Sequence, residues 1–90
     1  MTEQEKAQRV FEALKAAEAA EPQAALAALN GLIALTQGDG SDQSLEIDEA
    51  RSSAFLAICE VGKALHRGQP SPPPWPTAIA ATERWLALAR

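Results

Sequence analysis

The residues able to do chemistry are few, and a single cysteine and a single histidine come first. Cys59 and His66 lie seven positions apart in one apolar segment. A structural zinc site takes four ligands, usually several cysteines and histidines together. The sequence therefore does not predict a zinc site. We expect Cys59 to behave as a small buried hydrophobe and His66 as a capping or surface residue.

Calcium is the second metal to consider, because a short acidic loop begins at Asp39. Asp39, Ser41 and Gln43 match the first ligand positions of an EF-hand loop. The glycine expected at position six is replaced by Ser44, and the bidentate glutamate at position twelve by Ala50. We therefore expect a solvated loop without a metal, and keep a metal-responsive regulator as an alternative function.

No spacing in the chain predicts a catalytic site. An acidic pair such as Glu46 and Glu49 does acid–base work only in a cleft, and this pair follows directly on a loop. A nucleophile, its base and an orienting group cannot be assigned. Gly38-Asp39-Gly40 lacks the strand and helix that flank a phosphate-binding loop. We predict a protein that is not an enzyme and needs no cofactor.

The composition indicates a fold made of helices. The chain has 90 residues, of which 47 % are apolar and 22 % charged, as in a single globular domain. Alanine is abundant, and aromatic and β-branched residues are few, which argues against strands. We predict an all-α bundle of three to four helices over residues 1–90, with a Pro-rich extended strap before the last helix.

Local signals divide the chain into these elements. Thr2 and Glu5 form the pattern of a capping box at the first helix, Pro22 suits the first turn of the second, and Thr77 is the expected N-cap of the last. The helices are expected at residues 2–21, 22–36, 45–67 and 77–89, with a loop at 37–44 and the extended strap at 69–76. A single kinked helix over residues 2–36 is the alternative for the first two.

The segment Ile47 to Gly68 is the expected centre of the bundle. It carries an apolar stripe at helical spacing, and Gly68 with Pro70 ends it. The stripe consists of Ile47, Ala50, Ala54, Ile58, Val61 and Leu65, and a second stripe beside it of Phe55, Cys59, Gly62 and His66. We also expect Gly31, in the second helix, to lie at a close helix crossing, and Trp75 to pack on the bundle.

Two surfaces are candidates for binding a partner. The first is acidic: the net charge is −4, and five carboxylates gather within eleven residues, namely Asp39, Asp42, Glu46, Asp48 and Glu49. This charge disfavours direct nucleic-acid binding and predicts contact with a basic protein surface. The second is apolar, because Leu56 lies opposite the main stripe and the helix over 22–36 is apolar nearly all round. Its residues are Leu29, Leu32, Ile33 and Leu56.

The expected function follows from these surfaces. We predict a non-enzymatic, acidic protein–protein interaction module that occludes or bridges a partner surface and forms a homodimer. The alternative is an inhibitor from a phage or mobile element, similar in action to an anti-CRISPR protein, that blocks a basic nucleic-acid-binding groove. One cysteine, a polar N-terminus and no apolar run of about 18 residues predict a cytoplasmic protein without a membrane segment.

Overall fold

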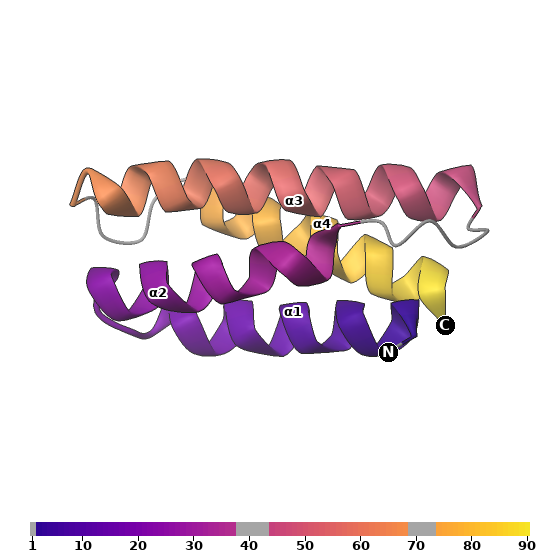
Figure 1. The fold of residues 1–90 in the computed structure, drawn as a ribbon, viewed down its shortest axis with the longest axis horizontal. Helices are drawn as coiled ribbons and strands as arrows, with labels where there is room; N and C mark the ends of the chain where they lie inside the picture. The colour runs from indigo at the N-terminus through magenta and orange to yellow at the C-terminus, as the bar shows by residue number, and fades with distance from the viewer. Residues whose placement is uncertain (1, 38–43, 69–73) are drawn as a thin grey trace.

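The computed structural model describes residues 2–37, 44–68 and 74–90 and shows an all-α bundle (Figure 1). Its elements are α1 (Glu3–Glu18), α2 (Pro22–Leu32), the 3-10 helix η1 (Ile33–Thr36), α3 (Leu45–His66) and α4 (Pro74–Ala89). The start of α1 and the end of α4 lie at the same end of the bundle (Figure 1). The predicted all-α fold is confirmed.

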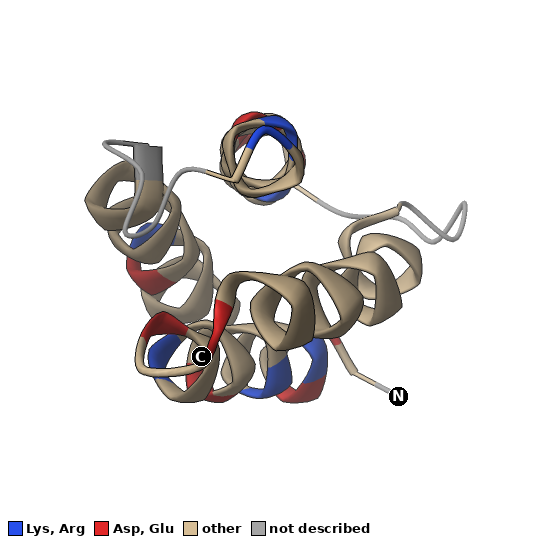
Figure 2. Cartoon of the chain, turned by 90° about the vertical axis from the view of Figure 1, so that its left-hand side faces the viewer, with Lys and Arg blue, Asp and Glu red and all other residues tan. Residues whose placement is uncertain are grey.

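Each long helix packs against two neighbours, in the order α1, α2, α3, α4 and back to α1. Seen end-on, the four helices are arranged around one axis (Figure 2), and their buried hydrophobic side chains form one core cluster. The largest fully buried side chains of that core are Trp85, Leu14, Leu29, Ile58, Val10, Val61 and Thr82. The radius of gyration, 12.4 Å, matches the roughly 12 Å expected of a compact chain of this length.

The helix α1 begins with the predicted capping box. The Glu5 backbone N–H donates to the Thr2 hydroxyl at 3.1 Å, and the Thr2 backbone N–H donates to Glu5 Oε1 at 3.3 Å. These bonds satisfy donors that a helix start otherwise leaves unpaired. The helix ends at Glu18, so Pro22 opens a separate α2 at its first turn. The alternative of one kinked helix is wrong.

The second helix differs from the prediction in two details. It ends at Leu32, and Ile33–Thr36 form a tighter 3-10 turn instead of continuing the α-helix. The buried Thr36 hydroxyl donates to the Ile33 carbonyl at 2.8 Å, which suits the narrower turn. Gly31 is exposed and a Cβ there would meet nothing within 4 Å, so the predicted close crossing is also wrong.

The central helix α3 follows its prediction closely. The Ser44 hydroxyl accepts from the Ile47 N–H at 3.2 Å and caps its start. Of the main stripe, Ile47 is half-buried and the other five residues are buried. Gly68 has a φ of 80°, the left-handed conformation that ends a helix, and its N–H donates to the Leu65 carbonyl at 2.9 Å.

The last helix starts earlier than the sequence indicates. It begins at Pro74, so Thr77 lies inside the helix and is not its N-cap. Prolines fit a first turn, where their missing N–H would be unpaired in any case. Trp75 lies in this turn and is 3 % exposed, which confirms that it packs on the bundle. The predicted strap therefore loses residues 74–76 to the helix, and its residues 69–73 lie outside the described chain.

Candidate functional site

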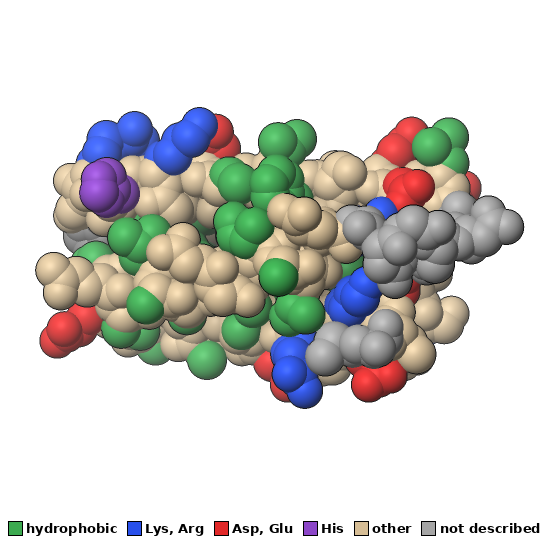
Figure 3. All heavy atoms as spheres, in the orientation of Figure 1, with side chains coloured by type: hydrophobic (Ala, Val, Ile, Leu, Met, Phe, Trp, Pro, Cys, Tyr) green, Lys and Arg blue, Asp and Glu red, His purple; other side chains and the backbone are tan. Residues whose placement is uncertain are grey.

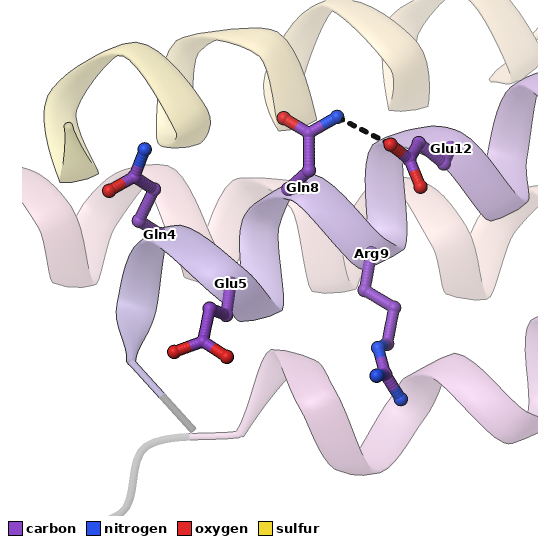
Figure 4. A pocket seen from close by; sticks show the side chains of 5 residues that line it. All are labelled: Gln4, Glu5, Gln8, Arg9 and Glu12. Carbon is purple, nitrogen blue, oxygen red and sulfur yellow. Dashed lines mark hydrogen bonds between the residues drawn. The ribbon is translucent and has the colours of Figure 1, made fainter.

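The hollow on α1 shows why no catalytic site can be assigned there. It measures about 290 Å³ and is lined by residues of this one helix: Gln4, Glu5, Gln8, Arg9 and Glu12. In Figure 4, Glu5 and Arg9 project away from Gln4 and Gln8. The Gln8 amide donates to Glu12 Oε1 at 2.8 Å. Among the described residues, no second element lines this hollow, so its side chains form an open helix surface.

Cys59 is less buried than expected, and His66 is a surface residue as expected. Both lie on α3, the thiol half-buried and the imidazole exposed. Within the part of the chain that the structure describes, no group of three His, Cys, Asp or Glu residues is placed to hold a metal ion. The EF-hand-like residues Asp39, Ser41 and Gln43 lie outside that part. Among the described helices, none is long and apolar enough to cross a membrane.

A buried polar cluster joins α1, α3 and α4. The Arg51 guanidinium donates to Glu3 Oε1 and to Asp48 Oδ1, and Trp85 Nε1 donates to the same Glu3 oxygen at 3.3 Å. Lys6 Nζ lies 3.4 Å from Glu3 Oε2. The Glu3 and Arg51 side chains are only 7 % and 8 % exposed. The Glu3 carboxylate is thus surrounded by donors from the chain itself, which makes the cluster structural.

This cluster stabilises the protonated form of Arg51. Burial lowers the pKa of Arg51, but hydrogen bonds and charge from Glu3 and Asp48 outweigh it and raise the pKa above its ordinary value. This pair was not predicted from the sequence, although a signal exists. Glu3 and Arg51 each occupy a position of an apolar stripe, where a charge needs a partner.

The predicted acidic surface is only partly present among the described residues. Glu46 and Glu49 are exposed on α3, while Asp48 is half-buried and paired with Arg51. Asp39 and Asp42 lie outside the described residues. Among the described residues, therefore, Glu46 and Glu49 are the two exposed carboxylates of the predicted acidic surface.

The predicted apolar surface divides between the core and the outside. Leu29 and Leu32 are buried within the single chain, and Ile33 is half-buried. Ile33 lines a hollow of about 430 Å³ between α2 and α3, together with Leu26, Leu29, Asn30, Ile58, Cys59, Gly62, Lys63 and His66. Leu56 is 62 % exposed, as its position opposite the main stripe predicts.

The exposed side of α3 carries the two large hydrophobic side chains that are exposed in the described part of the chain. Leu56 lies at its middle and Leu45, 73 % exposed, at its start. We call it the outer face of α3, and it comprises Leu45, Glu49, Ser52, Leu56, Glu60, Lys63 and Arg67, all exposed and three or four positions apart. In Figure 3, hydrophobic side chains lie over the middle of α3 and α2, with blue side chains near the C-terminal end of α3 and red ones at its N-terminal end.

The outer face therefore has three parts in order along the helix. Leu45 and Glu49 stand in its first turns, Leu56 in the middle, and Lys63 and Arg67 at its C-terminal end, with Glu60 between Leu56 and Lys63. A hollow of about 470 Å³ beside Leu45, Glu49 and Leu56 is bounded on the α4 side by Arg84.

No protein-family model, curated protein or solved structure matches this chain.

Proposed function

We propose that this chain is a non-enzymatic protein–protein interaction module that binds through the outer face of α3. The observation that carries the proposal is the 62 % exposure of Leu56 at the centre of a face on which Glu49 and Lys63, of opposite charge, lie seven positions to either side. Exposure of a large apolar side chain to water is unfavourable in free energy, and burial against a protein partner would remove that cost.

The charge order on the face defines the chemistry of the partner. A fitting surface presents an apolar side chain opposite Leu56, a cation opposite Glu49 and a carboxylate opposite Lys63. Such an arrangement fixes orientation and raises the association rate more than it adds affinity. Binding should therefore weaken as salt rises, because the charges involved are exposed and screened.

The inhibitor of a basic groove is a narrower form of the expected function and has less support. It needs a continuous acidic surface, whereas Asp48 is paired with Arg51 inside the chain and Lys63 and Arg67 stand on the same helix as Glu46 and Glu49. A partner that was basic throughout would meet repulsion at the C-terminal end of α3.

The test compares two single substitutions to aspartate. Tagged wild-type chain, Leu56→Asp and the control Ala80→Asp, which changes an exposed residue of α4, are used to capture proteins from host lysate. Each identified protein is purified, and its binding to the three chains is measured by calorimetry. We expect at least one captured protein to bind wild type and Ala80→Asp with equal affinity. Its affinity for Leu56→Asp should be at least about tenfold lower, a loss of about 1.4 kcal/mol in binding free energy. If every captured protein binds Leu56→Asp as well as wild type, the proposal is wrong.

A further inference from the structure

The outer face of α3 has a spacing that reads the same from either end. Its seven residues are separated by four, three, four, four, three and four positions, with Leu56 at the centre. At about 100° per residue, Leu45, Glu49, Lys63 and Arg67 all lie within roughly 20° of Leu56 around the helix. A helix with this pattern can lie against a reversed copy of itself with each position facing its counterpart.

The charges along the face suit that reversed pairing. In an antiparallel pair centred on Leu56, Glu49 faces Lys63 of the second copy, and Lys63 faces Glu49. Leu45 faces the long stem of Arg67, Ser52 faces Glu60, and the two Leu56 side chains meet. A parallel pair would instead set Glu49 against Glu49 and Lys63 against Lys63, which is unfavourable.

We propose that the partner of the outer face is a second copy of this chain, bound as an antiparallel α3–α3 pair about a two-fold axis at Leu56. This inference rests on the proposed function and names its partner. Closed two-fold dimers use the same patch on both subunits, which requires a patch complementary to itself. The outer face meets that requirement in both spacing and charge.

The existing contact of Lys63 does not oppose the pairing. Lys63 Nζ lies 3.4 Å from Glu60 Oε1, with the side chains 66 % and 59 % exposed. An exposed pair of this kind contributes little. Lys63 is therefore able to turn toward Glu49 of the second copy while Glu60 faces Ser52.

The size of the face sets the expected strength. The 22 residues of α3 span about 33 Å. We expect a contact confined to one helix from each copy to lie at the small end of the roughly 1,200–2,000 Å² that stable interfaces bury. We expect a dimer whose population rises with protein concentration and falls with salt.

The test is a charge exchange measured by sedimentation equilibrium and native mass spectrometry. Glu49→Lys and Lys63→Glu each place like charges at both contacts of a homodimer, so each variant alone is expected to be monomeric where wild type dimerises. Mixed in equal amounts, they restore both opposite-charge contacts, and a heterodimer should form. Leu56→Asp should stay monomeric, alone or mixed.

Matched controls separate this pairing from net charge. Glu46→Lys changes the charge as Glu49→Lys does but lies off the centre of the face, and Lys15→Glu matches Lys63→Glu on another helix. Both should dimerise as wild type does. Wild type that stays monomeric up to about 1 mM, or a mixture that stays monomeric, would overturn the dimer. The proposed function then still has its own test in the calorimetry with Leu56→Asp.

Discussion

The Arg51 guanidinium on α3 hydrogen-bonds to the Glu3 carboxylate at the start of α1, 48 positions earlier in the chain. Both side chains are nearly removed from water. Trp85 of α4 donates to the same carboxylate, so one oxygen of Glu3 is shared by two other helices. This shared contact fixes the positions of α1, α3 and α4 along their axes relative to one another. It therefore also fixes the position of the outer face of α3 in the bundle.

The first prediction concerns the charge of Glu3. Glu3→Gln keeps the shape of the side chain but leaves Arg51 buried with only Asp48 as a charged partner. Removing one partner of a buried ion pair costs about 3–5 kcal/mol, a large share of the roughly 5–15 kcal/mol that stabilises a domain. Urea unfolding should show this loss. Glu12→Gln, an exposed glutamate of the same helix, should change stability by less than about 0.5 kcal/mol; equal losses in the two variants would show that Glu3 is not required as a charge.

The second prediction separates the two tryptophans. Both are buried, but Trp85 Nε1 donates to Glu3 at 3.3 Å, whereas Trp75 Nε1 has no hydrogen-bond partner among the described residues. Trp85→Phe removes a hydrogen bond to the charged Glu3 carboxylate, whereas Trp75→Phe removes an N–H that has no partner among the described residues. Trp85→Phe should therefore destabilise the chain by about 1–3 kcal/mol more than Trp75→Phe.

The measurement is helped by the composition, since the chain has two tryptophans and each variant keeps one. Unfolding followed by fluorescence reports the remaining indole, and circular dichroism gives an independent midpoint. A loss for Trp75→Phe as large as that for Trp85→Phe would contradict the assignment of the Glu3 contact.

The third prediction is a dependence on pH at the start of α1. Hydrogen bonding of the Glu5 carboxylate to the Thr2 backbone N–H, and then to the Thr2 side chain, lowers the pKa of Glu5 below its ordinary value. A carboxyl whose folded pKa is depressed contributes stability that is complete above its unfolded pKa, about 4.3, and is lost as pH falls through the folded pKa. Glu5→Gln removes this contribution, so its melting temperature should approach that of wild type as pH falls below about 4.

A direct reading of the same effect comes from NMR titration of the Glu5 carboxyl carbon. In Thr2→Ala the hydroxyl contact is absent, and the pKa of Glu5 should rise toward its ordinary value. An unchanged pKa in that variant would assign the shift to the backbone N–H of residue 2 alone.

Signals confined to one helix could be predicted from the sequence. The Thr2–Glu5 capping box depends on residues three apart, and the stripe of α3 depends on helical spacing. Gly68 ends α3 because only glycine takes a positive φ without strain. The exposure of Leu56 follows from its angle around the same helix, which is why this residue was found without a structure.

Contacts between helices could not be predicted in the same way. The pairing of Glu3 with Arg51 depends on the position of α1 along the axis of α3, which no local sequence pattern determines. The early start of α4 depends on burying Trp75, a packing gain that outweighs the extended preference of the prolines before it. Leu29 and Leu32 were assigned to an interface, because an apolar helix facing its own core looks the same in sequence as one facing a partner.

The last prediction uses a glycine in the middle of α3. A Cβ at Gly62 would meet Leu26 Cδ1 at 3.8 Å, an ordinary contact, so Gly62→Ala should be accommodated. Alanine is favoured over glycine inside a helix by about 0.8–1.0 kcal/mol, and the new methyl adds packing in the hollow between α2 and α3. Thermal unfolding should show a gain in stability of about that size.

Gly31→Ala is the matched control, because a Cβ there meets nothing within 4 Å and the residue stands next to the end of α2. Its gain should be smaller, and a loss of stability in Gly62→Ala would mean that α2 and α3 approach more closely than the structure places them.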